Sequence, residues 1–505
     1  MNVPALLAAA VLANGPVQAE DRPNIILIVA DDLGWGDLGC YPKGAAWGPE
    51  AITPTPCIDA LAASGVRFTQ GYATAMVCAP SRAALLTGKN QQRFGYYGFE
   101  DTLAPIPSDL KLLPEALREA GYRTGMFGKW HVSSAAGSWP LDRGFDQFFG
   151  FIGGQHDYFQ RNIGEKMHGI GRAADAMVYD QDRPAERIGF LTDEFTDRAL
   201  GFMAGGGRPF FLYLPFNAPH PPMQVPWRDL APYAAQRADG KSTSRDIARA
   251  MIENLDRNVG RIVAWLEEKG LRENTLIVFT SDNGGSDGGP DRVLQHNGGL
   301  KGRKSTYYEG GIRVPLILSW PERLPAGEVF RKPVSQLDLF PTFLAAAGSP
   351  KVTTQAFDGV NLLPYLNGEN ASVPHPLLFW CVSNDVAWAI REGDWKLVRD
   401  DVDPTTLGGK FRGDAPREYK LQLYDLASDP QETKDVLDDN PDVAARLQKR
   451  MAAIRAELAP TLATPEIVAA WKAELAERAK TPALNEARSL PGAPDQPASS
   501  PRGAK

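Results

Sequence analysis

The sequence is short of cysteine, of histidine and of positive charge. Only 4 of its 505 residues are cysteine and 6 are histidine, which is too few and too scattered for a disulfide scaffold or a zinc framework. Its 54 Lys and Arg are outnumbered by 61 Asp and Glu, for a net charge of −7. An acidic chain has no general attraction to nucleic acids or anionic membranes, so any anion must be bound locally. We therefore expect no nucleic-acid partner.

Long apolar runs are also missing. No stretch approaches the ~20 continuous apolar residues of a membrane span, so none is expected. A shorter apolar run at residues 5–13 precedes Val-Gln-Ala at 17–19, which is typical of a signal peptide cleaved near Ala19. This predicts export to the periplasm or the exterior, although residues 2–5 lack Lys and Arg; an apolar N-terminal helix is the alternative. At the other end, the composition of residues 476–505 predicts a flexible tail.

What the chain does contain is a series of short apolar runs. Runs typical of strands buried on both faces occupy residues 24–30, 124–128, 210–214, 276–280 and 314–318. Amphipathic helical patterns lie between them at residues 106–120, 193–204 and 246–270. Pro315 weakens the last strand or places it near a sheet edge. The alternation predicts an α/β domain over residues 20–375, with a mostly parallel central sheet flanked by helices.

The pattern changes after about residue 375. Glu392-Gly393-Asp394 is a hairpin signal between two apolar segments. Strands and then a helix are expected at residues 387–391, 395–399, 421–424 and 441–457. We expect a smaller C-terminal α+β domain with an antiparallel sheet over residues 376–475.

Polar side chains follow four of the expected strands. They are the pairs Asp31/Asp32, Lys129/His131, Asn217/His220 and Asp282/Asn283. Ligands of parallel sheets bind beyond the carboxyl ends of the strands, so four such ends suggest one polyanion or metal site. Three carboxylates and an amide oxygen suit Ca²⁺ or Mg²⁺ rather than zinc. An EF-hand loop does not fit, because residue 284 is Gly.

Two of these carboxylates are adjacent in the chain. Neighbours within a strand point to opposite faces, so Asp31 and Asp32 can serve one ion only if the strand has already ended. The alternative is that both acidic pairs lie in ordinary solvated loops.

A helix is expected to begin near Cys78. Residues 78–88 read Cys-Ala-Pro-Ser-Arg-Ala-Ala-Leu-Leu-Thr-Gly; Pro80 fits the first helical position and Gly88 the stop. The N–H groups of such an end favour an anion. Arg82 lies at the wrong end for a cation, which suggests a specific partner. The alternative for a lone cysteine is a buried small apolar residue.

These residues resemble the complete signature of the type I sulfatases, which are arylsulfatase-like members of the alkaline phosphatase superfamily. Further blocks resemble the same family in the same order, at residues 31–37, 128–131, 144–158, 219–220, 281–284, 304–315 and 423–430. The resemblance implies that residues 20–375 form the catalytic domain of a sulfuric ester hydrolase.

The resemblance also implies a modified nucleophile and a metal. A maturation enzyme would read the signature in the unfolded chain and convert Cys78 to Cα-formylglycine. The hydrated aldehyde would attack sulfur, form a covalent sulfo-enzyme and release sulfate by elimination. The implied metal is Ca²⁺, with Mg²⁺ as the alternative. Its ligands would be Asp31, Asp32, Cys78, Asp282 and Asn283.

Roles for five other residues follow from the same resemblance. Arg82 would stabilise the formylglycine oxygens. Lys129 and Lys304 would bind sulfate oxygens and offset charge in the transition state. His220 would protonate the leaving oxygen, and His131 would assist the elimination.

Substrate recognition is expected at Gly-Gly-x-x-Asp-Tyr, residues 153–158. His156 and Asp157 would bind sugar hydroxyls, and Tyr158 or Phe159 would pack on a ring face; an ordinary surface loop is the alternative. Beside Lys304, Lys301 and Arg303 are either solvated charges or ligands of a second anionic group.

We expect hydrolysis of a sulfated carbohydrate or a simple sulfate ester. A phosphatase or phosphonate monoester hydrolase on the same fold is one alternative, against which the Cys78 signature and the single set of carboxylates argue. A catalytically silent sugar-binding homologue is another, if Cys78 stays a thiol.

Overall fold

The computed structural model describes residues 22–42, 53–159, 167–170, 177–185, 189–236, 240, 242–286, 296–349, 353, 355–383, 386–401 and 419–480. The chain divides into two compact units, Met1–Leu462 and Ala463–Lys505. The second contains helix α11 (Pro465–Lys480), which reaches into the range 476–505 expected to be a tail. The signal peptide predicted at residues 1–19 and the tail from residue 481 lie outside the described residues.

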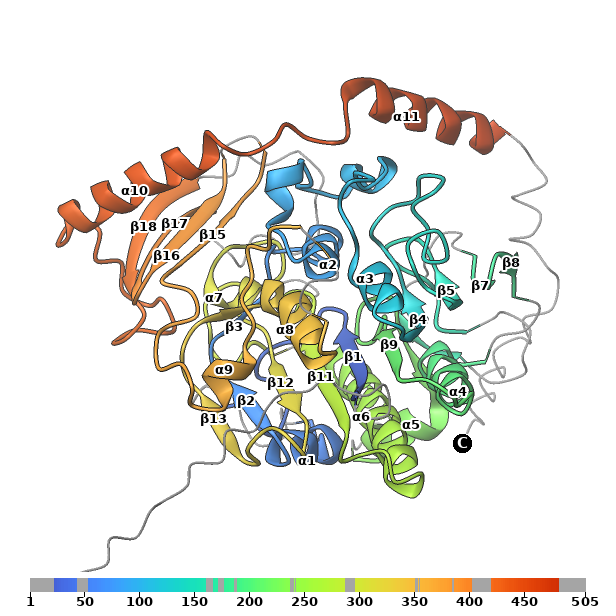
Figure 1. Cartoon of the computed structure of the whole chain (residues 1–505). Helices are drawn as coiled ribbons and strands as arrows, with labels where there is room; N and C mark the ends of the chain where they lie inside the picture. Colours follow the sequence, from blue (N-terminus) through green and yellow to red (C-terminus); the bar gives the residue numbers. More distant parts are fainter. Residues whose placement is uncertain are drawn as a thin grey trace, which may run out of the picture. The chain divides into compact units, whose positions relative to one another are not determined.

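The first unit is built on a ten-stranded mixed sheet, seen in Figure 1. In sheet order its strands are β13 (Glu328–Phe330), β2 (Val66–Phe68), β12 (Leu316–Ser319), β11 (Thr275–Ser281), β1 (Asn24–Ala30), β9 (Phe210–Pro215), β4 (Arg123–Lys129), β5 (Gln147–Phe151), β7 (Tyr179–Asp180) and β8 (Arg183–Pro184). The strands from β11 to β5 are parallel to their neighbours in that series. The predicted α/β fold class is confirmed.

Helices cover both faces of the sheet because its central strands are apolar throughout. Ile26 and Ile28 of β1 join one core with helices α1 (Pro56–Ala63), α4 (Leu191–Met203), α5 (Trp227–Ala235) and α6 (Ser244–Glu268). Ile25 and Leu27 join the other with helices α2 (Cys78–Thr87), α3 (Leu113–Glu119) and α8 (Leu339–Ala346). Alternate residues of a strand point to opposite faces, so a strand with two apolar faces needs both layers.

Two expected elements begin later than their patterns suggested. The helix expected over residues 106–120 is wrong in its first half, because α3 begins at Leu113 with Pro114 in its first turn. Proline fits that turn and blocks a helix that would run through it. Strand β12 begins directly after Pro315 and is antiparallel to both of its neighbours.

A four-stranded antiparallel sheet follows in the chain. Its strands are β15 (Leu377–Cys381), β16 (Trp388–Glu392), β17 (Trp395–Asp401) and β18 (Tyr419–Asp425). Gly393, at a φ of 59°, forms the expected hairpin turn, whereas β15 was not anticipated. Helix α10 (Pro441–Arg455) packs Leu447 and Met451 against this sheet.

The remaining elements are short. They are β3 (Gly71–Tyr72), β6 (Met167–Ile170), β10 (Met223–Pro226), β14 (Val334–Ser335), α7 (Glu309–Ile312), α9 (Leu363–Leu366) and the 3₁₀ turns η3 (Gln91–Phe94), η4 (Glu100–Leu103) and η5 (Gln336–Asp338). Over the residues that the structure describes, no helix has both the length and the apolar character that a membrane span requires.

A buried ion pair lies where the chain enters the C-terminal sheet. Nε2 of His375 is 2.7 Å from Oδ1 of Asp338, and both side chains are buried. Burial alone would lower the pKa of His375, but the carboxylate of Asp338 outweighs that effect and raises the pKa above its ordinary 6.5. The charged pair therefore stabilises the fold fully below that value, and its contribution is lost as the pH rises through the higher folded pKa.

We predict that His375→Gln lowers stability by about 1 to 2 kcal/mol near pH 5 and by much less near pH 9. Glutamine keeps a neutral donor and loses only the charge. The check is the difference in thermal melting midpoint between wild type and variant at the two pH values. A difference of the same size at both would contradict the prediction.

Candidate active site

The candidate site lies at the carboxyl ends of four adjacent strands, β11, β1, β9 and β4. Strands β1 and β11 end in register, with Ala30 beside Ser281, so Asp31 and Asp282 leave the sheet side by side. The N–H of Asp31 then donates to the carbonyl of Ala218, beyond the end of β9 (3.1 Å). The sheet order thus brings together the four polar segments that the sequence placed at strand ends.

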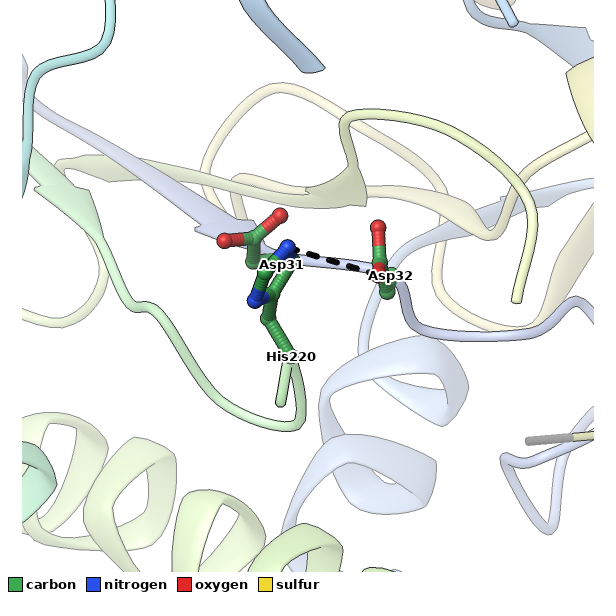
Figure 2. Close-up of side chains that lie close together, drawn as sticks. All are labelled: Asp31, Asp32 and His220. Carbon is green, nitrogen blue, oxygen red and sulfur yellow. Dashed lines mark ion pairs between the residues drawn. The ribbon is translucent and has the colours of Figure 1, made fainter. Parts of the chain in front are cut away.

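The two adjacent aspartates face one site because β1 ends at Ala30, before both of them. Asp32 adopts a φ of 65°, in the left-handed region, and this breaks the alternation of side chains. Carboxylate oxygens of Asp31 and Asp282 and the Sγ of Cys78 lie within 4.8 Å of one another. A second group, formed by carboxylate oxygens of Asp31 and Asp32 and a ring nitrogen of His220, meets the same limit. Figure 2 shows His220 beside both carboxylates.

Cys78 is the first residue of α2, and Gly88 ends that helix at a φ of 65°. The side chain of Cys78 forms no disulfide and is 1% exposed. Burial raises the pKa of this thiol although Lys129 and Lys304 oppose the shift. Burial therefore disfavours the thiolate form of this side chain.

Arg82 has a specific partner, as its place in the first turn of α2 suggested. Its Nε donates to Oδ2 of Asp282 at 2.8 Å, and its Nη1 donates to the carbonyl of Lys129 at 3.0 Å. The guanidinium is 0% exposed. Burial alone would lower the pKa of Arg82, but Asp282 outweighs it and raises that pKa. Arg82 thus joins the ends of β11 and β4 as a permanent cation.

Two lysines pair with the other two carboxylates. Nζ of Lys129 is 2.6 Å from Oδ2 of Asp31, and Nζ of Lys304 is 2.6 Å from Oδ1 of Asp32. Burial opposes ionisation of Asp32, but Lys304 outweighs it and holds the pKa of this carboxyl well below its usual range. Burial and the nearby Asp31 carboxylate raise the pKa of Asp282 to about 6. Three cations therefore face three carboxylates.

Two histidines lie near these charges. Nε2 of His220 is 3.8 Å from Oδ2 of Asp32 (Figure 2), and its Nδ1 bonds to the carbonyl of Pro221. Burial and then Lys304 lower the pKa of His220 to about 3. His131 is buried and stacks on Phe99 with ring centroids 5.7 Å apart; burial and then Lys129 lower its pKa well below the usual range. Both rings are therefore neutral at pH 7.

Backbone strain is concentrated here. Only five non-glycine residues have a positive φ in the described part of the chain, and three of them are Asp32, His131 and Ser305 beside Lys304. Such conformations cost roughly 1 to 3 kcal/mol each and persist where the surrounding structure enforces them. For Ser305, its N–H donates to the carbonyl of Met76 at 2.8 Å.

The donor set fits a hard divalent cation. Oδ1 of Asp31 and Oδ1 of Asn283 are buried, and neither finds a hydrogen-bond partner among the described residues. The amide of Asn283 is already oriented, because its Nδ2 donates to Oδ1 of Asp32 at 2.8 Å and to the carbonyl of Gly284 at 2.9 Å. Buried oxygens without donors are costly unless a cation occupies the space between them.

The segment expected to bind the substrate, residues 153–158, is only partly exposed to solvent. His156 and Asp157 are half-buried. Nδ1 of His156 contacts the carbonyl of Asp157 at 2.6 Å, and Oδ1 of Asp157 accepts from Nε2 of Gln224 at 2.8 Å. The suggestion that Tyr158 or Phe159 packs on a sugar ring is wrong, because they are 0% and 2% exposed.

The two cations beside Lys304 are not simply solvated. Arg303 is 5% exposed. Nζ of Lys301 donates to the hydroxyl of Tyr424 at 2.8 Å and lies 4.3 Å from the ring centroid of Tyr308. Lys301 therefore binds the C-terminal sheet.

Two residues of the site, Asn217 and Gly154, were given no role of their own by the sequence analysis. Asn217 is buried, and neither atom of its amide finds a hydrogen-bond partner within the described ranges; its place at a strand end was the available signal. Gly154 is required by His131, because a Cβ there would lie 2.7 Å from Nε2 of that ring. The Gly-Gly pair indicated a close approach without revealing its partner.

The family model and the curated relatives agree on one family. The family model described as Sulfatase matches residues 23–349. Arylsulfatase A of Bos taurus is 34% identical, over 87% of this chain and 87% of that protein. N-acetylgalactosamine-6-sulfatase of Canis lupus familiaris is 33% identical, over 77% and 74%. The crystal structure of Ps i-CgsB in complex with k-i-k-neocarrahexaose has a TM-score of 0.72 and 30% identity, covering 91% of this chain and 100% of that one.

We predict that Ca²⁺ raises the melting midpoint of the metal-free protein, since a ligand at 100 times its Kd stabilises by about 2.7 kcal/mol. Asn283→Ala should reduce this shift, because it removes an oxygen for which the described part of the chain offers no hydrogen-bond partner. Mg²⁺, titrated in the same way, decides between the two ions.

Asn258→Ala is the control. Asn258 is a buried amide of α6, bonded to Asp193 at 2.8 Å, so its loss should lower the midpoint and leave the Ca²⁺ shift intact. A Ca²⁺ shift in Asn283→Ala equal to that of wild type would exclude this residue as a ligand.

Proposed function

Because the chain belongs to the sulfatase family and is therefore a sulfuric ester hydrolase, we propose that it desulfates a carbohydrate by means of formylglycine at position 78. The observation that carries this proposal is the place of the signature cysteine. Cys78 begins α2, and its Sγ lies within 4.8 Å of carboxylate oxygens of Asp31 and Asp282.

The proposal includes two groups that the chain acquires. Hydrated formylglycine would supply one hydroxyl to attack the sulfur with release of the alcohol, and a second whose deprotonation would expel sulfate and restore the aldehyde. A Ca²⁺ or Mg²⁺ ion supplies Lewis-acid polarisation of the sulfate. The residues that would hold the ion are Asp31, Asp32, Asp282, Asn283 and the modified residue 78.

The cations of the site have distinct roles in this proposal. Arg82 holds Asp282 and the backbone of Lys129 in place and offsets charge near residue 78. Lys129 and Lys304 are bonded to carboxylates in the structure, and a bound sulfate ester offers them anionic oxygens instead. Their positive charge stabilises the oxygens on which charge develops as the ester bond breaks.

The neutral histidines fit acid and base roles. Pro221 fixes the Nδ1 side of His220, so Nε2 is the nitrogen that faces the site. An adjacent anion raises the pKa of an imidazole, so a bound sulfate ester would favour protonation of His220. The protonated ring can then donate its proton to the leaving oxygen. His131, whose neutral form is strongly favoured, is suited to accept the proton released during elimination.

The substrate class is supported by relatives and by one segment of this chain. N-acetylgalactosamine-6-sulfatase and the Ps i-CgsB complex with k-i-k-neocarrahexaose connect similar chains with carbohydrates. We propose that His156 and Asp157 bind hydroxyls of the sugar, because Gln224 holds this carboxylate in a fixed place.

Maturation and export complete the proposal. A formylglycine-generating enzyme would act on residues 78–88 before folding, because Cys78 is 1% exposed in the folded chain. The apolar run at residues 5–13 would direct the protein to the periplasm or the exterior.

We predict that the peptide containing residue 78 from active protein has a mass about 18 Da below that of the cysteine form, because an aldehyde replaces the thiol group. Peptide mass spectrometry measures this directly. Active protein with an unmodified thiol would overturn the formylglycine proposal and leave a different nucleophile to be found.

The same preparation is then assayed on sulfated mono- and oligosaccharides and on an aryl sulfate. Turnover of a sugar sulfate supports the carbohydrate proposal. Strong turnover of the aryl ester alone would contradict it.

We predict that Gly154→Ala lowers kcat by about 10- to 100-fold. The added Cβ would lie 2.7 Å from Nε2 and 2.8 Å from Cε1 of His131, and the ring must move. Gly153→Ala is the matched control, because a Cβ at Gly153 meets no described heavy atom within 4 Å. Steady-state kinetics of both variants, with melting midpoints, test this, and equal kcat values would contradict the role of His131.

A further inference from the structure

We propose that Tyr158 is a positioning residue for His220, which it holds through the backbone of the loop that carries this histidine. The inference rests on the proposed function, in which His220 serves the leaving oxygen of the sulfate ester.

The hydroxyl of Tyr158 reaches both ends of a tight turn. Its single O–H proton is shared between two acceptors, the carbonyl of Asn217 at 2.5 Å and the carbonyl of His220 at 2.8 Å. Within the turn, the N–H of His220 donates to the same carbonyl of Asn217 at 2.9 Å. One phenol therefore ties the first and last residues of the turn to a point outside it.

This loop needs an outside donor because of its composition. Pro219, Pro221 and Pro222 make up half of residues 217–222, and proline has no N–H. The loop therefore has carbonyl groups to satisfy and few donors of its own. The buried hydroxyl of Tyr158 supplies what the prolines lack.

Tyr158 is itself held in place. Its N–H donates to Oε1 of Gln224 at 2.8 Å, and its ring stacks on Phe190 with centroids 5.7 Å apart. The same Gln224 donates to the carboxylate of Asp157 at 2.8 Å. The segment proposed to read the sugar and the loop that carries His220 are thus joined through Tyr158, and its 0% exposure excludes a direct contact with substrate.

The test is Tyr158→Phe on the mature enzyme, with a series of aryl sulfates whose leaving groups differ in pKa. We expect kcat to fall by about tenfold or more for poor leaving groups, much less for activated ones, and KM to change little. His220→Ala provides the reference, and its loss should depend on the leaving group in the same sense.

Tyr122→Phe is the matched control. Tyr122 is also 0% exposed, and its hydroxyl donates to the carbonyl of Pro23 at 2.9 Å. Pro23 directly precedes β1, so this bond lies at the amino ends of the parallel strands, away from the site. This variant should lose stability, and any loss in kcat relative to wild type should be the same for every leaving group. A loss in Tyr158→Phe that is uniform across the series, or no greater than that in Tyr122→Phe, would overturn the proposal.

A measurement that needs no activity separates this inference from the proposed function. Hydrogen exchange of residues 216–224 should be faster in Tyr158→Phe than in both wild type and Tyr122→Phe. Unchanged exchange overturns the positioning role. If exchange is faster in Tyr158→Phe but the wild-type protein cleaves no sulfate ester, the result supports the role of Tyr158 in holding the loop. It refutes the proposed function instead.

Discussion

The structure of the site depends on the pairing of buried charges beyond the carboxyl edge of the sheet. Arg82 pairs with Asp282, Lys129 with Asp31 and Lys304 with Asp32. Breaking a buried ion pair costs about 3 to 5 kcal/mol, because it leaves one charge buried without a partner. Each pair joins segments that are far apart in the chain, so the strand ends cannot separate without exposing a charge to apolar surroundings. The same pairing keeps oxygens and ammonium groups close together in a small volume, as binding of a cation and an anionic ester requires.

The C-terminal sheet also contributes a buried charge that helps to hold the site together. Nζ of Lys396, in β17, is 2.8 Å from carboxylate oxygens of both Glu309 and Glu432, and the Lys396 side chain is 0% exposed. Glu309 begins α7, a few residues after Lys304, and Lys301 reaches Tyr424 of β18. Both sides of the Lys304 segment are therefore bonded to elements beyond residue 376. This explains why a sheet that supplies none of the expected ligands still matters to the position of the lysine.

Much of the fold could be predicted because strands and their ends are local properties. The apolar run of β1 and the polar pair Asp31-Asp32 that follows it are both read within a few residues. The start of helix α3 was predicted too early because amphipathic spacing continued through Pro114, and steric exclusion by the proline ring prevailed. Tyr158 was misjudged for a different reason. Its burial depends on Phe190 and Gln224, residues that no local pattern connects with it.

The sequence by itself determined which kinds of side chain stand at the strand ends, that a cysteine begins a helix, and that the donor set suits a hard cation. These depend on spacing and residue chemistry over short stretches. Only the tertiary structure decided which groups pair. Asp282 lies 200 residues from Arg82, and the hydroxyl of Tyr158 meets a carbonyl 62 residues away. Hydrogen bonds and ion pairs act over a few ångströms, so their partners are set by how the strands are ordered in the sheet, and separation along the chain carries no information about that order.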